Sequence, residues 1–109
     1  MGRGPRSTSS KTMSLPLLIK PEAENDLVEA FAWYQDRRDG LGVEFLLAYE
    51  AALGAIHRNP GAFPDVHRGI HRAILRRFPY AVYYLIGEQL TVIAVTHAKR
   101  HPRRWQKRG

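Results

Sequence analysis

Two adjacent apolar runs decide the fold: Tyr80-Ala81-Val82-Tyr83-Tyr84-Leu85-Ile86 and Leu90-Thr91-Val92-Ile93-Ala94-Val95-Thr96. Both runs are rich in aromatic and β-branched residues, which fit the pleated, half-buried surface of a strand. The three residues between them, Gly87-Glu88-Gln89, suit a compact turn. The pattern predicts a β-hairpin over residues 80–96. Pro79 cannot donate to a ladder, so it marks the start of a strand or an edge.

A basic tail follows this hairpin directly. Residues 97–108 hold six Lys or Arg together with Trp105, and the whole chain carries a net charge of +7. From Arg58 onward there are eleven Lys or Arg and only two acids, whereas eight of the ten acids lie earlier. Such a positive half attracts phosphates or an acidic protein, although an ordinary solvated basic surface would show the same excess.

Two helices are predicted upstream of the hairpin. Apolar residues recur at helical spacing over residues 22–34 and again over 45–56, and acids open the first helix, where the dipole favours them. The segment Asp39-Gly40-Leu41-Gly42 separates the two helices, and Asn59-Pro60-Gly61 ends the second. A break this short predicts an antiparallel helical hairpin.

Two further strands complete the predicted sheet. Leu15 to Ile19 is a short apolar run that Pro21 stops, and residues 69–77 alternate basic and apolar side chains imperfectly. Residues 59–67, with two prolines and a glycine, predict the loop that returns the chain to the sheet. Neither side of residues 69–77 is purely apolar, so one face of that strand stays wet or meets a ligand.

The order strand, helix, helix, strand, strand, strand defines an α+β fold. We expect the helical hairpin to pack on one face of a largely antiparallel sheet, with the other face free and a short basic C-terminal tail. Residues 14–109 suffice for one domain. Residues 1–13 are basic and lack acids, which predicts a disordered N-terminal extension.

Several classes of protein are excluded by what the sequence lacks. There is no cysteine, which excludes disulfide scaffolds, thiol nucleophiles and Cys-ligated zinc. No apolar run approaches the ~20 residues of a transmembrane helix, and the N-terminus has no signal-peptide stretch. Two His pairs at a spacing of four have no cysteine ligand with them, so we expect no metal and no cofactor. The sequence predicts a cytoplasmic protein that does not bind membranes.

Candidate site residues gather on the strand at 69–77 and in the tail. Arginine presents a planar fork to phosphate or carboxylate, and aromatic rings on an open sheet face suit stacking on bases. We expect Ala81 and Tyr83 to face a groove beside His97 and Arg100, while Tyr80, Val82, Tyr84 and Ile86 face the helices. The residues predicted to contact a target or nucleic acid are Arg76, Tyr83, Lys99, Arg103, Arg104, Trp105 and Arg108.

His97 is the one candidate for proton transfer. It ends a buried-looking strand immediately before the basic tail, and imidazole titrates near neutrality. This position suits either a general acid or base, or a strand-end hydrogen bond that fixes the tail.

Several motifs together resemble a known family. They are Arg77-Phe78-Pro79-Tyr80, then Tyr83-Tyr84, then Val95-Thr96-His97-Ala98-Lys99-Arg100, followed by Pro102 and Trp105. They resemble the RelE/ParE superfamily of toxins from type II toxin–antitoxin systems, whose ParE-like members include plasmid stabilisation proteins. The resemblance extends over nearly all of residues 14–108, because the Gly40-Leu41-Gly42 junction and Pro60 after the second helix also match.

The resemblance implies a growth-inhibiting toxin held inactive by a co-encoded antitoxin, whose extended segment wraps across the helices and the sheet. RelE-like members cut messenger RNA on the ribosome, whereas ParE-like members bind DNA gyrase and cut nothing. For a nuclease, we expect His97 to act as acid or base, with Arg72, Arg77 and Arg100 holding the phosphate. Of these residues, Arg100 matches a basic position of the family at the end of the last strand. Relatives that cut RNA carry an arginine about where Ala81 stands, which favours gyrase binding. A non-toxic nucleic-acid-binding module is the remaining alternative.

Overall fold

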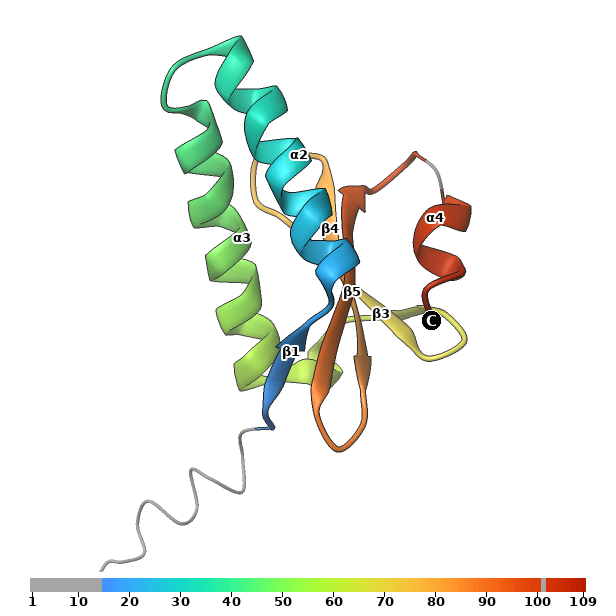
Figure 1. Ribbon diagram of the computed structural model, residues 1–109. Helices are drawn as coiled ribbons and strands as arrows, with labels where there is room; N and C mark the ends of the chain where they lie inside the picture. The colour runs from blue at the N-terminus through green and yellow to red at the C-terminus, as the bar shows by residue number, and fades with distance from the viewer. Residues whose placement is uncertain (1–14, 101) are drawn as a thin grey trace, which may run out of the picture.

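The fold is described by a computed structural model that covers residues 15–100 and 102–109 (Figure 1). Its elements in chain order are β1 (Leu17–Ile19), α2 (Pro21–Arg37), α3 (Leu41–Arg58), the 3-10 helix η1 (Pro60–Ala62), β2 (Asp65–His67), β3 (Ile70–Ile74), β4 (Tyr80–Ile86), β5 (Leu90–His97) and α4 (Pro102–Gln106). The extension predicted over residues 1–13 lies outside the described residues, as does His101 in the tail.

The five strands form one sheet in the order β1-β5-β4-β3-β2. β1 runs parallel to β5, with Leu17 opposite Leu90, and every other neighbouring pair is antiparallel. Parallel neighbours need a long crossover connection, and the two helices between β1 and the rest of the sheet supply it. The predicted α+β fold with a largely antiparallel sheet is confirmed.

The helices α2 and α3 form the predicted hairpin and cover one face of the sheet (Figure 1). Glycine is required at their junction, because a Cβ on Gly42 would lie 2.9 Å from the ring and the carbonyl oxygen of Phe31. The side chain of Gln35 accepts hydrogen bonds from the N–H groups of Gly40 and Gly42, at 3.2 and 3.1 Å. Among the described residues, no helix has the length and apolar character to span a membrane.

An aromatic cluster ties this hairpin to the sheet. The rings of Tyr34, Phe45, Phe78 and Tyr80 contact one another with centroids 5.0 to 5.8 Å apart. Each such contact contributes about 0.5–1.5 kcal/mol beyond the burial of the rings. The cluster therefore holds α2 and α3 against the beginning of β4, next to the point where β5 ends.

The strand predicted over residues 69–77 is shorter in the structure. β3 ends at Ile74, and the chain then turns back toward β4 with Arg77 in the left-handed region at φ 67°. Leu75 is buried in the core beneath the helices and holds the start of this turn. Arg76 and Arg77 therefore lie in an exposed turn and not on a strand.

The loop predicted over residues 59–67 contains one strand that the sequence pattern missed. β2 pairs with β3, and the carboxylate of Asp65 accepts hydrogen bonds from the N–H groups of His67 at 3.0 Å and Gly69 at 2.9 Å. These bonds shape the β2–β3 turn, in which Gly69 has a φ of 87°. A three-residue strand flanked by proline and glycine has too little periodicity to be detected.

The second face of the sheet is covered, contrary to the prediction that it is free. α4 packs on the side of the sheet away from α2 and α3 (Figure 1). Its Trp105 stacks on Tyr83 of β4, with ring centroids 4.2 Å apart and planes inclined by 12°. Both rings are buried in a small second core that also contains Ile70, Ala81, Ile93 and Ala94.

Candidate functional site

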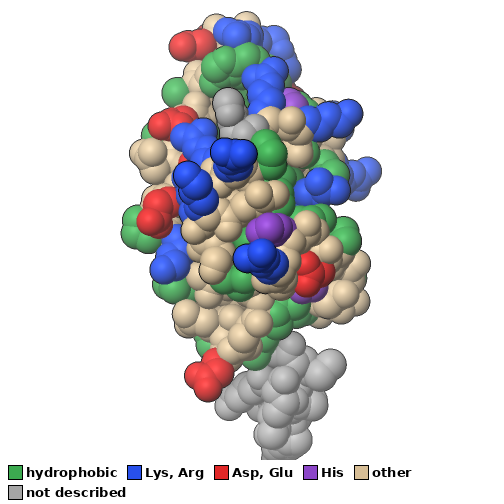
Figure 2. Space-filling model, turned by 90° about the vertical axis from the view of Figure 1, so that its right-hand side faces the viewer, with side chains coloured by type: hydrophobic (Ala, Val, Ile, Leu, Met, Phe, Trp, Pro, Cys, Tyr) green, Lys and Arg blue, Asp and Glu red, His purple; other side chains and the backbone are tan. Residues whose placement is uncertain are grey.

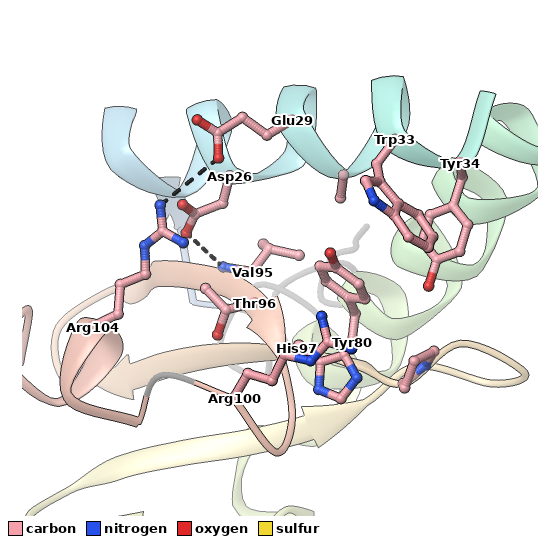
Figure 3. Close-up of a pocket in the computed structure, with 12 residues that line it drawn as sticks. Asp26, Glu29, Trp33, Tyr34, Tyr80, Val95, Thr96, His97, Arg100 and Arg104 are labelled. Atoms are coloured by element: carbon pink, nitrogen blue, oxygen red, sulfur yellow. Dashed lines mark hydrogen bonds and ion pairs between the residues drawn. The ribbon is translucent and has the colours of Figure 1, made fainter. Parts of the chain in front are cut away.

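A cleft of about 330 Å³ opens between α2 and the ends of β4 and β5 (Figure 3). We call it the α2–β5 cleft. Its walls come from α2, from β4 and β5, and from the basic segment that follows β5. The residues that line it are Asp26, Glu29, Ala30, Trp33, Tyr34, Pro79, Tyr80, Val95, Thr96, His97, Arg100 and Arg104.

One end of the cleft combines aromatic rings with a cation. Tyr80 and His97 face each other across β4 and β5, with ring centroids 5.8 Å apart, and Arg100 lies beside them (Figure 3). His97 Nδ1 accepts a hydrogen bond from the N–H of Lys99 at 3.1 Å. Burial raises the pKa of Tyr80, an effect that Arg100 partly offsets. The phenol therefore keeps its proton at neutral pH and is available as a donor.

Trp33 forms the rim at this end. Its side chain is 47% exposed, and the Arg37 guanidinium lies 3.7 Å from the ring centroid. The edge of the ring also contacts Tyr34, with centroids 5.0 Å apart. These contacts hold an exposed tryptophan in one orientation, so a partner that covers it loses little side-chain entropy.

The other end of the cleft carries two carboxylates of α2. Glu29 lies 3.8 Å from Arg104, and both side chains remain about half exposed. Asp26 is buried, and it accepts hydrogen bonds from the N–H of Val95 at 3.1 Å and from Arg108 at 2.6 Å. Each carboxylate at this end is therefore matched by an arginine from the tail.

The Asp26–Arg108 pair also closes the outer edge of β5. β1 pairs only with residues 90–92, so the later part of β5 has no neighbouring strand on that side. There Asp26 accepts from the N–H of Val95, and Arg108 donates to the carbonyl of Ile93 at 3.1 Å. A buried ion pair is favourable only when its other hydrogen-bonding groups are satisfied, and these backbone contacts satisfy them.

The cleft brings together only some of the predicted site residues. His97, Arg100 and Arg104 line it. Lys99 and Arg103 are exposed in the same segment without lining the cleft. These five residues form one basic surface at the end of β5.

Other predicted residues lie elsewhere. Arg72 is opposite Tyr83 in the β3–β4 register, so it projects from the face of the sheet that α4 covers, away from His97. Arg76 and Arg77 line a separate depression beside α3, where Arg77 lies 3.9 Å from Glu44.

The prediction that Tyr83 and Trp105 stack on bases is wrong. Tyr83 has no exposed surface and Trp105 is 5% exposed, because each ring is the stacking partner of the other. Ala81 is also fully buried on that face and does not look into the cleft. Side chains alternate along a strand, so Tyr80 faces the cleft instead.

Among the cleft residues that the sequence reasoning missed, three left a signal. Asp26 is a carboxylate on the apolar stripe of its helix, three positions after Ala23 and four before Ala30. A charge in such a place indicates a buried partner. Glu29 and Trp33 are four apart and lie off the stripe, which places them together on the exposed side of α2.

The face that α4 covers is strongly basic. Figure 2 shows Lys and Arg side chains gathered over the upper part of this face, with few acids among them. The exposed members of the tail include Lys99, Arg100, Arg103, Arg104 and Lys107. A positive surface of this kind speeds the approach of an anionic partner.

A helical hairpin on one face of a largely antiparallel sheet is the arrangement expected of a RelE/ParE-type fold, and here a cleft lined by both arginines and carboxylates opens where β5 ends. A solved structure described as the chromosomal ParDE toxin–antitoxin system from P. aeruginosa matches this chain with a TM-score of 0.69. The match covers 78% of this chain and 97% of the other, at 16% sequence identity, and it supports the fold alone.

Two sequence comparisons give the family. The family described as the ParE toxin of the type II toxin–antitoxin system parDE matches residues 17–102. Toxin ParE2 of Mycobacterium tuberculosis, in strains CDC 1551 / Oshkosh and ATCC 25618 / H37Rv, is 30% identical over 92 residues, which is 83% of this chain and 88% of the relative. The chain therefore belongs to the ParE toxin family, and it is a ParE-like toxin of a type II toxin–antitoxin system.

Proposed function

We propose that this toxin arrests growth by binding DNA gyrase without cutting RNA, and that a co-encoded antitoxin neutralises it. One observation carries the choice of target. The four residues predicted to act in a nuclease, His97, Arg72, Arg77 and Arg100, do not share a site, because only His97 and Arg100 line the cleft. Gyrase and the antitoxin both lie in the cytoplasm, which is where the toxin would act.

The chemistry of RNA cleavage explains why this separation matters. Attack of a ribose 2′-hydroxyl on the adjacent phosphate requires a base, an acid and cations within hydrogen-bond reach of one phosphate. Arg72 projects from the opposite face of the sheet, and Arg77 lies beside α3. Ala81 carries no charge and is fully buried in the same second core as Trp105. Loss of one transition-state donor costs about 10²–10³-fold in rate, so the remaining pair would support little cleavage.

The charge distribution supports a proteinaceous inhibitor. The toxin carries a net charge of +7, and its exposed cations gather near the end of β5. An acidic antitoxin segment would be attracted to this surface before any close contact forms. The solved relative is described as a ParDE system, which is consistent with a partner of this kind.

Ribosome-dependent RNA cleavage is the second candidate, and one observation favours it. His97 and Arg100 are adjacent at the mouth of an open cleft, as an acid or base and a phosphate-binding group would be (Figure 3). A non-toxic nucleic-acid-binding module is disfavoured, because the chain belongs to a toxin family.

Controlled expression of the full chain separates the two targets. For gyrase binding we expect growth arrest, inhibition of supercoiling by the purified toxin, and no new messenger RNA ends by primer extension. Fresh RNA ends in ribosome-bound messages, with supercoiling unaffected, would overturn the proposal and assign the nuclease. If a small acidic reading frame adjoins the toxin's own, its co-expression tests the antitoxin, since it should restore growth.

A further inference from the structure

We propose that the α2–β5 cleft is the anchor point for a protein target, and that it receives a peptide segment with an acidic side chain next to a basic one. The inference rests on the proposed function in that the segment belongs to the protein that the toxin inhibits. Beyond the proposed function, it specifies where on the toxin the target binds and which charges the bound segment carries.

The two ends of the cleft differ in charge, because no described carboxylate lines the Arg100 end, whereas Glu29 at the other end forms a half-exposed pair with Arg104. Arg100 and His97 lie at one end, and Glu29 lies at the other, on the exposed side of α2 (Figure 3). A peptide can offer a carboxylate to Arg100 and an ammonium or guanidinium to Glu29. A nucleic-acid strand carries negative charge along its whole length, so a phosphate would meet the Glu29 carboxylate. The charge pattern therefore fits protein better than RNA or DNA.

The charged groups are available for a partner. Among the described residues, the Arg100 guanidinium makes no hydrogen bond or ion pair, and the side chain is exposed. The Glu29–Arg104 pair is half exposed, and pairs of this kind contribute about 0–1 kcal/mol, so it exchanges partners at little cost. The planar fork of arginine binds a carboxylate through two parallel hydrogen bonds.

The rest of the cleft has the composition of an interface centre. Trp33, Tyr34 and Tyr80 supply three rings, and tryptophan, tyrosine and arginine are the residues that dominate binding energy at protein interfaces. Tyr34 and Tyr80 both have a pKa raised mainly by burial, so their phenols remain donors at neutral pH. A volume of about 330 Å³ is enough for one or two side chains of a peptide that crosses the cleft.

Photo-crosslinking maps the occupant. The chain carrying p-benzoylphenylalanine in place of Trp33 is irradiated with purified gyrase holoenzyme, and the crosslinked peptide is identified by mass spectrometry. We expect a peptide with an Asp or Glu within a few residues of the crosslink. The same substitution at Leu47, which is exposed on α3 and does not line the cleft, is the matched control and should give no such product.

A charge exchange then tests the contact itself. Arg100→Glu should weaken binding by about 100-fold, and reversal of the mapped acid to arginine on the target should restore at least about tenfold. Arg58→Glu makes the same charge change on the exposed end of α3 and should alter affinity less than threefold. Circular dichroism confirms that each variant is folded.

The outcomes separate this inference from the gyrase assignment. If wild-type toxin leaves supercoiling unaffected, gyrase is the wrong target, and the crosslink is repeated in toxin-expressing cells with the charge exchange made on the protein that it identifies. Restored binding in that charge exchange would support the cleft as the contact site for the target. A crosslink to RNA or DNA, a peptide without an acid, or no rescue by the exchanged pair would overturn the inference.

Discussion

The two ends of the basic tail are both rich in Lys and Arg, but the first end is exposed to solvent and the second is partly buried. Arg100, at the end of β5, is exposed and makes no ion pair among the described residues, whereas the Arg108 side chain is 20% exposed and is bonded to a buried carboxylate. Trp105 lies between them with its ring inside the second core. One half of the tail is therefore exposed, whereas the other half, with Trp105 and Arg108, anchors the tail to the rest of the fold.

The anchor half should dominate stability, and Trp105→Ala should have the largest effect on the free energy of unfolding. Removal of a buried tryptophan costs about 3–5 kcal/mol, and here it also uncovers Tyr83. We expect a loss of about 3 kcal/mol by urea denaturation, because the short α4 can detach without unfolding the rest. Trp105→Phe keeps the stacking and should lose less than half as much. Equal losses would show that stacking contributes nothing.

Arg108→Ala should follow, with a loss of about 2 kcal/mol. Removing one partner of a fully buried ion pair costs about 3–5 kcal/mol, and the partial exposure of Arg108 reduces that figure. Asp26 would keep only the N–H of Val95 as a partner. Lys107→Ala removes an exposed cation one residue away and should cost less than about 0.5 kcal/mol. The same unfolding assay compares the two variants.

Alkaline pH should probe the opposite face of the sheet. Burial raises the pKa of Tyr84 to about 12, above its unfolded value of 10.0, so its contribution is complete below about pH 10 and is lost as the pH rises to about 12. At pH 11 the loss from this residue is about 1 kcal/mol. Tyr84→Phe should flatten the fall in stability between pH 10 and 12. An unchanged slope would contradict the assignment.

Arg100→Ala should have the smallest effect on folding, below about 0.5 kcal/mol, because an exposed arginine without an ion pair stabilises little. If the exposed half of the tail contacts the target, Arg100→Ala should abolish growth arrest. A plate assay beside thermal unfolding measures both quantities. Retained toxicity in a stably expressed variant would move the contact away from the cleft.

Much of the fold could be predicted because its signals are local. Helical spacing located α2 and α3, and the runs around Gly87-Glu88-Gln89 located the β4–β5 hairpin. The cover of the second face could not be predicted in this way. It depends on contact between Trp105 and Tyr83, which are far apart in sequence. The sequence alone does not show whether an aromatic side chain is exposed or buried.

The site was harder to predict than the fold for the same reason. His97 and Arg100 are three residues apart in sequence and share the cleft, whereas Arg72 and His97 were both assigned to one nuclease site and lie on opposite faces of the sheet. Which face a residue occupies depends on register, and a shift of one residue reverses it. Ala81 shows this, since it was expected beside His97 and lies in the same second core as Trp105.

The contact between Asp26 and Arg108 also bears on how truncated forms of this toxin would behave. Without the last residues, the C=O of Ile93 would lose Arg108, and only the bond from the N–H of Val95 to Asp26 would still cover this strand edge, which lies within a run of high β-propensity. Such edges template pairing between molecules. A shortened toxin would tend to aggregate, so the harmlessness of a C-terminal deletion would reflect lost solubility as much as a lost contact with the target.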